Sequence, residues 1–389
     1  MRHRARRRLE VLHHLRTGLG LTIVRARFRL LSAAAAVAAV GCTGFGGNPV
    51  PVSQPAQAQQ PAAQRFTIDA RQHVDLWLHA FALVQSDSSK LPFFRRGYLD
   101  SVMAQRKRAN VLSMIDVNRD QLAGRFLAFP NLVSAQFIPL YFGTWEETRQ
   151  SATLFLRTGG DERQAADLRS QQIVRLFAGY FPTQQDRDWL RLFVQAVDDE
   201  RTKFFASYWR AQTLSRSPAR ASVDSLWRNG YGQRLARFLN NSGADRGTIL
   251  LSLPLNGEGR TLDLGQRNRV VAVNFPETPA DAREALFTFV HEVVSSVTSI
   301  AIDDNTSPAD KRAGVGDRYA SAALVRGGAM LMQRVAPELA DGYARYYLRS
   351  ARVQFSTGDP MAALATAFPL PDAIRDGIRR QIDVVLGGI

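Results

Sequence analysis

The amino-acid sequence predicts a predominantly α-helical α+β protein with a small antiparallel sheet in its C-terminal part. Apolar residues recur at helical spacing through most of residues 65–240, which is typical of amphipathic helices. Two β-like runs follow, at residues 247–255 and 268–275, and they precede an apolar helix at residues 279–300. With 389 residues, 45% of them hydrophobic, the chain can bury one large core or two modest ones.

Composition divides the chain into four segments. We expect a leader at residues 1–41, a flexible tether at 42–64, a helical domain at 65–244 and a C-terminal domain at 245–389. The tether is rich in Pro, Gln, Ala and Gly and lacks charge. Cys42 is the single cysteine, so the chain forms no internal disulfide and its stability must come from packing.

More than half of the excess positive charge belongs to the leader. The net charge is +15, and residues 1–41 contribute +8 of it through nine arginines and one glutamate. Residues 42–389 carry the remaining +7, with 41 basic against 34 acidic residues. Neither a recognised motif nor a broad basic stripe supports nucleic-acid binding, so we expect no nucleic-acid partner.

The leader has the features of a bacterial export signal. Arginines precede an apolar run at residues 30–41, which is too short for a membrane-spanning helix. Residues 39–42, AVGC, resemble a bacterial lipobox, which implies that Cys42 is lipidated and begins the mature protein. We therefore expect a lipid-anchored protein of the bacterial cell envelope. Cleavage after residues 56–58, AQA, is the alternative and would give a periplasmic or secreted protein.

The helical domain opens with residues 66–84, in which the apolar residues from Val74 to Val84 make an amphipathic helix. His73 and His79 lie six residues apart and project from different faces, so they form no metal-binding pair with each other. His79 is the expected distant partner of a central site if the helices meet. The basic run at residues 105–108 and the acidic run at 198–200 are interpreted as solvated surface.

Helix boundaries are marked by turn and capping residues. Residues 162–240 predict three helices, separated at residues 182–183 and 215–218. Two closing helices are expected at residues 337–354 and 371–386.

The apolar helix at residues 279–300 is the one place where residue type, spacing and local structure together suggest chemistry. Thr278 can cap it, and Pro279 suits its first position. Its apolar residues cover most of the circumference, as in a helix buried on nearly all sides. Within it, Glu292 follows His291, and burial is costly for a carboxylate unless it is paired, hydrogen-bonded, protonated or near a metal.

The stretch FTFVHEVVSSV, which contains His291 and Glu292, resembles the active-site helix of the zincin metallopeptidases. Their motif is H-E-x-x-H, in which two histidines at i and i+4 bind zinc and the Glu activates a water. The resemblance implies that His291 is a zinc ligand and Glu292 the general base. It also implies that residues 268–275 form an edge strand beside a cleft, where an extended peptide can pair.

The chain departs from the zincin pattern at two of the three ligand positions. Ser295 stands where the second histidine is expected. Residues 319–335 resemble the second helix of the gluzincin branch, and there Arg326 stands where the third ligand, a Glu, is expected. The metzincin position for a third ligand, ten residues after the first, is Ala301. One imidazole cannot hold a catalytic zinc, and Arg326 could replace the charge of the metal and pair with Glu292.

Three interpretations stay open: a packed histidine beside a surface acid, a metal-free relic of a zincin site, and a working metalloenzyme with unusual ligands. We expect an exported envelope protein with a metal-free, inactive peptidase-type site, which acts in binding or scaffolding and needs no cofactor. The alternative is an active zinc metallopeptidase with Glu292 as general base and His291 as ligand. The expected partners are the membrane, through the lipid on Cys42, and a peptide or protein in the cleft.

Overall fold

A computed structural model of the protein describes residues 65–85, 94–355 and 358–387. These residues form many helices and one four-stranded sheet, which confirms the predominantly helical α+β class. The leader, Cys42 and the tether lie outside the described residues, so export, lipidation and tethering stay predictions.

The sheet is mixed, which corrects the expectation of an antiparallel one. Its strands are β1 (Phe66–Asp69), β2 (Arg246–Ser252), β3 (Arg260–Asp263) and β4 (Asn268–Asn274). Their order is β1-β2-β4-β3; β1, β2 and β4 are parallel, and β3 is antiparallel to β4. The reason is that the chain leaving β2 first forms β3 on the far side of β4. It then turns back, so that β4 runs in the same direction as β2.

This topology also corrects the expected edge strand. Residues 268–274 form β4, which is flanked by β2 and β3, and the edge on that side of the sheet is β3. The turn from β3 to β4 contains Gly265, Gln266 and Arg267, all with positive φ (79°, 49° and 62°). The sequence did not reveal β3, because a strand of four residues has too short a pattern to be recognised.

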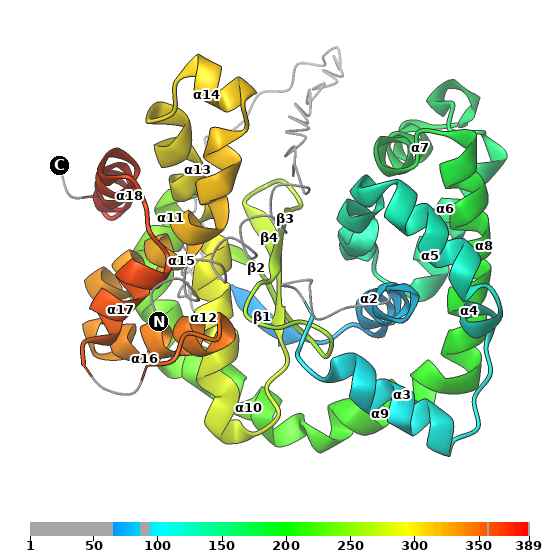
Figure 1. The fold of residues 1–389 in the computed structure, drawn as a ribbon, viewed down its shortest axis with the longest axis horizontal. Coiled ribbons are helices and arrows are strands. Elements are labelled where there is room, and N and C mark those ends of the chain that lie inside the picture. The colour runs from blue at the N-terminus through cyan, green and yellow to red at the C-terminus, as the bar shows by residue number, and fades with distance from the viewer. Residues whose placement is uncertain (1–64, 86–93, 356–357, 388–389) are drawn as a thin grey trace, which may run out of the picture.

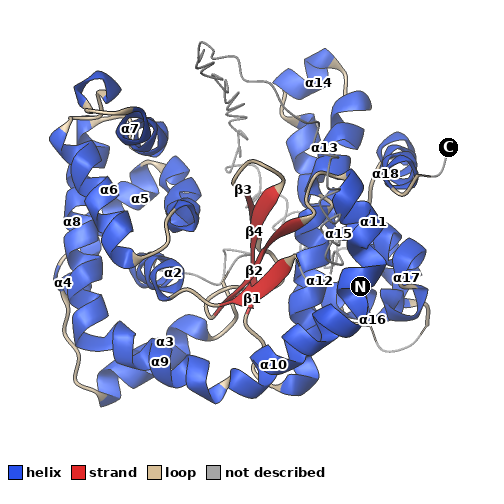
Figure 2. Ribbon diagram, turned by 180° about the vertical axis from the view of Figure 1, so that it is seen from behind, coloured by secondary structure: helices blue, strands red, loops and turns tan. Residues whose placement is uncertain are grey.

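Helices surround the sheet in the shape of a U (Figure 1). The chain before β2 contains α2 (Gln72–Val84), α3 (Tyr98–Arg108), α4 (Met114–Val117), α5 (Arg119–Ala128), η3 (Pro130–Tyr141), α6 (Trp145–Arg157), η4 (Glu162–Gln164), α7 (Leu168–Tyr180), α8 (Gln184–Glu200), η5 (Arg201–Phe205), α9 (Ala206–Ser215), α10 (Ser217–Leu226), η6 (Trp227–Tyr231) and α11 (Gly232–Asn241). The chain after β4 contains η7 (Pro279–Asp281), α12 (Ala282–Val293), α13 (Ser295–Asp304), α14 (Pro308–Arg312), α15 (Val315–Val335), α16 (Pro337–Ser350), α17 (Pro360–Ala367) and α18 (Asp372–Val385). One arm of the U contains α4 to α8 and the other α11 to α18, with α3, α9 and α10 at the base. Figure 2 shows from behind that the strands lie between the arms, beside α12.

The helices expected in residues 162–240 are present. They are α7, the continuous helix α8–η5–α9 and the continuous helix α10–η6–α11, in which η5 and η6 are π-helical turns. Thr183 and Asp186 form a capping box at the start of α8, and Pro218 lies in the first turn of α10. The turn and capping residues therefore marked these boundaries.

Strand β1 joins the chain on either side of residue 245 in one sheet. Residues 66–69, which precede the expected amphipathic helix, pair with β2, and Phe66 lies opposite Gly247. A Cβ atom at Gly247 would lie 1.9 Å from the backbone oxygen of Arg269, so only glycine fits between β1 and β4. The parts at 65–244 and 245–389 are therefore not independent of each other.

Aromatic side chains hold β1 against α12. Phe66, Trp227 of η6 and Phe289 of α12 pack edge to face, with ring centroids 5.0 to 5.5 Å apart. A second aromatic group joins α2 to α8, where the rings of Phe81 and Phe193 are 5.1 Å apart. Each arm of the U thus has its own aromatic packing.

The apolar segment Pro279–Asp304 is long and apolar enough to cross a membrane by length and composition. In this fold, 72% of its most apolar stretch is buried inside the protein, and ten of the twelve residues of α12 are buried. The segment thus packs here as a core helix.

A buried carboxylate joins α2 to the sheet and to α9. Asp75 is 1% exposed and accepts hydrogen bonds from Ser252 Oγ (2.5 Å), Leu253 N–H (3.2 Å) and Trp209 Nε1–H (2.8 Å). Burial raises the pKa of Asp75 to about 6, although the hydrogen bonds oppose this shift. The Asp75 side chain therefore connects three elements, and its contribution to stability depends on pH.

This contribution should appear in the pH dependence of the free energy of unfolding. Between pH 3.8 and about 6 the folded protein keeps a proton on Asp75 that the unfolded chain has lost. Stability from this group is therefore present at low pH and falls by about 3 kcal/mol as pH rises through that window. In Asp75→Asn we expect lower absolute stability but no such fall in urea unfolding from pH 4 to 7. The exposed control Asp120→Asn should keep the wild-type slope, and an Asp75→Asn slope equal to wild type would contradict the assignment.

Candidate functional site

His291 and Glu292 form a buried hydrogen-bonded unit near the end of α12. The Nδ1 atom of His291 lies 3.0 Å from Oε1 of Glu292, and the backbone N–H of Gly259 donates to the same oxygen at 3.1 Å. The His291 ring stacks on Tyr347 of α16, with centroids 5.3 Å apart. His291 is 2% exposed and Glu292 8%. The carboxylate therefore fixes the loop that leads into β3.

The glycines of that loop are explained by close packing. A Cβ atom at Gly259 would lie 2.1 Å from the backbone oxygen of Ala272 in β4 and 3.2 Å from Cγ of Glu292. The carbonyl of Gly257 accepts a hydrogen bond from the Tyr347 hydroxyl at 2.9 Å. The turn residues thus bring the loop between β4, α12 and α16.

One ring nitrogen of His291 has no partner in the described chain. Because Nδ1–H donates to the Glu292 carboxylate, Nε2 is the nitrogen that remains, and it is buried without a hydrogen bond. A zinc ligand would use such a nitrogen, so the imidazole itself fits a metal. The remaining donors decide whether a metal site exists.

Ser295 follows the junction between two helices. Val294 separates α12 from α13, and Ser295 begins α13, while the Val294 N–H still donates to the Val290 carbonyl at 3.4 Å. Ser295 supplies a hydroxyl where the zincin motif has an imidazole.

Arg326 lies in α15 and faces α18. Its guanidinium is half-buried, and the charged groups that act on it most strongly are Arg375 and Arg379. The suggested ion pair between Arg326 and Glu292 is not formed, since the described partners of the Glu292 carboxylate are Gly259 and His291. The physical reason is that the two glycines after Arg326 turn toward α13 and α16, which directs Arg326 to another face of α15.

These two glycines allow α15 to approach its neighbours closely. A Cβ atom at Gly327 would lie 2.7 Å from Thr298 Cγ2 in α13. One at Gly328 would lie 2.0 Å from the hydroxyl oxygen of Tyr343 in α16. Close packing of the helices thus explains why glycines stand at positions 327 and 328.

Gly328→Ala should destabilise the protein by about 2 kcal/mol, because the buried Tyr343 ring must move to admit the methyl group. Urea unfolding measures this effect. The matched control is Gly124→Ala in α5, where a Cβ atom meets nothing within 4 Å. That change should be neutral or stabilising by up to about 1 kcal/mol. Equal effects at the two glycines would contradict the packing explanation.

The side chains at the three expected ligand positions around His291 and Glu292 do not fit a catalytic zinc. The chain supplies one imidazole there, while the other two expected positions hold a serine and an arginine that faces elsewhere. Among the described residues, no three His, Cys, Asp or Glu side chains are grouped to hold a metal ion. A catalytic zinc normally has three protein ligands.

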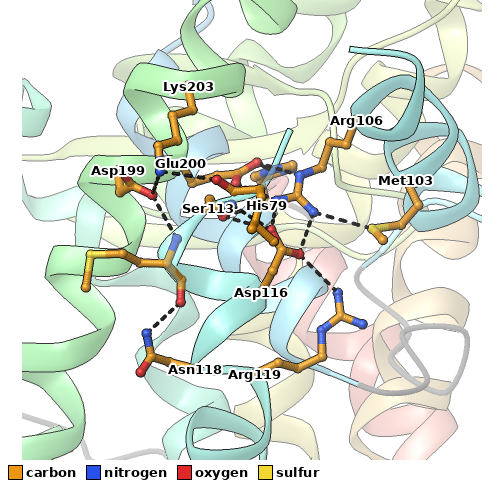
Figure 3. A network of polar contacts seen from close by, with 12 residues as sticks. His79, Met103, Arg106, Ser113, Asp116, Asn118, Arg119, Asp199, Glu200 and Lys203 are labelled. Atoms are coloured by element: carbon orange, nitrogen blue, oxygen red, sulfur yellow. Dashed lines mark hydrogen bonds and ion pairs between the residues drawn. The ribbon is translucent and has the colours of Figure 1, made fainter. Parts of the chain in front are cut away.

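His79 belongs to a different cluster, shown in Figure 3, in the N-terminal part. Its Nε2 lies 3.1 Å from Oε1 of Glu200, and its Nδ1 lies 3.1 Å from the Tyr98 hydroxyl. Arg106 donates to both carboxylate oxygens of Glu200, at 3.0 and 2.9 Å, and also to Asp116. None of the described contacts of His79 involves His291, so the expectation that His79 approaches the central site is corrected.

This cluster also corrects two surface assignments. Arg106, from the supposed basic face, is 2% exposed, and Glu200, from the supposed surface acids, is fully buried. Burial opposes ionisation of Glu200, but the hydrogen bond from His79 and the charge of Arg106 lower its pKa overall. Burial lowers the pKa of His79, so a neutral imidazole that donates from Nε2–H and accepts from Tyr98 fits the geometry.

The buried position of Glu200 leaves a signal in the sequence. Its helix-face neighbours are apolar, at Ala196, Val197 and Phe204, so spacing places Glu200 on the buried face of its helix. The same spacing applies to Arg106, which follows Val102 and Met103 by four and three residues and precedes Ala109 by three, although its immediate neighbours in sequence are polar.

Glu200→Gln should lower the free energy of unfolding by about 3 kcal/mol, because it leaves the buried Arg106 with one carboxylate partner instead of two. Asp188→Asn, on the exposed side of the same helix, should change stability by less than about 0.5 kcal/mol. Denaturant unfolding of both variants tests the difference, and a neutral Glu200→Gln would show that the cluster contributes little.

Comparison of the chain with known protein families, with curated proteins and with solved structures gave no match. The pair at the end of α12 can hold a loop, accept a hydrogen bond at Glu292 and present one buried imidazole nitrogen.

Proposed function

We propose that this is an exported, non-catalytic binding protein with a zincin-like arrangement, whose edge strand β3 takes an extended segment of a partner protein. Export and anchoring through Cys42 rest on the leader sequence. The arrangement is supported by α12 packed against a small sheet, with α15 crossing beside it and an antiparallel strand at the sheet edge.

The observation that carries the proposal is the hydrogen bond from Gly259 N–H to Glu292. In a zincin the equivalent carboxylate activates a water on the metal. Here the same oxygen accepts hydrogen bonds from the loop before β3 and from His291, and the residues present do not fit zinc. The peptidase-type pair thus serves to hold β3 beside α12.

Strand β3 offers backbone groups for pairing. Within the described sheet it bonds only to β4, and Leu264 N–H donates to the Asn268 carbonyl at its end. Because bonded and non-bonded pairs alternate in an antiparallel ladder, the backbone groups of Thr261 and Asp263 point away from β4. An extended peptide can add to such an edge as a further strand.

The charges around the strand favour an acidic segment. Arg260 lies in β3 itself, and Arg246 and Arg267 lie at the turn end of the hairpin. Asp245 pairs with Arg267, and Asp263 lies near Arg269, which leaves the rim basic overall. Acidic side chains on the bound strand would reach these arginines.

Thr261→Pro tests this function, because proline removes the outward N–H without removing a bond to β4. The probe is a panel of short, unstructured, fluorescently labelled peptides, acidic and basic, with affinity measured by anisotropy. We expect the acidic peptides to bind and Thr261→Pro to weaken them about tenfold or more. The matched control Thr261→Val keeps the N–H and replaces a buried hydroxyl that has no described partner, so binding and fold should be retained.

Zinc content and peptide cleavage, measured on the same protein, separate the alternatives. We expect well below one zinc per chain after equilibration with zinc, and no cleavage. One bound zinc per chain, with cleavage abolished in Glu292→Gln, would replace this proposal with an active metallopeptidase. Absence of saturable peptide binding, or binding unchanged in a folded Thr261→Pro, would remove the role of β3.

A further inference from the structure

A cavity of about 360 Å³ lies between α15, α17 and α18, away from the His291–Glu292 pair. Its polar lining comes from Arg326, Gln333, Arg334 and Arg379. Its apolar lining includes Met330 and Met361. The volume is at the lower end of the range for small-molecule sites, about 300 to 1,000 Å³.

The cations of this cavity are unequally compensated. Arg334 pairs with Asp383 at 2.9 Å, and Arg379 pairs with Asp376 at 3.3 Å. Arg326 has no hydrogen bond or ion pair to a carboxylate in the described chain, and burial together with its arginine neighbours lowers its pKa. A half-buried guanidinium without a counter-ion is unfavourable unless an anion from solution supplies the missing charge.

We propose that this cavity binds an oxyanion carried on a short apolar group, with the anion held by Arg326 and Arg379 and the apolar group against Met330 and Met361. A guanidinium donates two parallel hydrogen bonds to a phosphate or a carboxylate, which matches the shared chemistry of such headgroups. Methionine adapts its shape to an alkyl chain. The Gln333 amide, on the same wall, can donate a further hydrogen bond.

Calorimetric titration with a set of matched small probes tests the proposal. Hexyl phosphate and hexanoate carry both parts, inorganic phosphate carries the anion alone and 1-hexanol the apolar part alone. We expect saturable binding of at least one of the first two, about tenfold or more tighter than inorganic phosphate, and none of 1-hexanol. The ratio between hexyl phosphate and hexanoate identifies the headgroup.

Arg326→Gln should weaken the bound probe about tenfold or more while leaving the thermal midpoint unchanged or raised, because it removes an uncompensated charge. Arg318→Gln, an exposed arginine of the same helix outside the cavity lining, is the matched control and should bind as wild type. Absence of saturable binding, or equal affinity in Arg326→Gln and wild type, would overturn the site. Equal affinity for hexyl phosphate and inorganic phosphate would overturn its apolar part.

Discussion

Burial of α12 on nearly all sides is the constraint on which the rest of the structure depends. Strand β4 covers one side of it and α15 and α16 cover others, so its polar side chains must find partners inside the protein. Thr288 Oγ1 donates to the Asn274 side chain at the end of β4, and Glu292 accepts from the loop before β3. Both bonds connect α12 to the sheet. The hydrogen bonds that satisfy the polar side chains of this buried helix thereby help to position β3, the strand that we propose binds a partner.

Neighbouring faces of α15 make different contacts. Gly327 and Gly328 allow α13 and α16 to come within contact, whereas Arg326, next to them in sequence, faces the cavity beside α18. A motif comparison aligns residues by number and says nothing about the face on which each one stands. This is why Arg326 could be matched to a ligand position and yet lie apart from the pair it was expected to join.

Local sequence signals predicted the class of the fold and many of its boundaries. Thr183 and Pro218 mark helix starts, and the apolar stretch at residues 279–300 predicted a buried helix, because capping and periodicity depend on neighbours within a few residues. The pairing of Arg106 with Glu200 and the position of β1 depend on partners far along the chain. Such partners are selected by packing, which one sequence does not display.

The candidate site was predictable in part. Sequence placed His291 and Glu292 together on a buried helix, and the structure shows this arrangement. The role of Gly259 as donor to the carboxylate could not be read from a turn signal, since glycines in loops are common. The junction at Val294 was also hidden, because no proline marks it.

The pairing of β1 with β2 has a consequence for the order in which the chain folds. Thr67 and Thr248, which face each other across these strands, are 181 positions apart. The backbone contacts within a helix such as α8 instead join residues that are close in sequence. Closing so long a loop around a four-residue strand is slow and comes after the local helices have formed. Until it closes, Trp227 and Phe289 lack the covering ring of Phe66, so we expect this apolar surface to stay exposed until the sheet is complete.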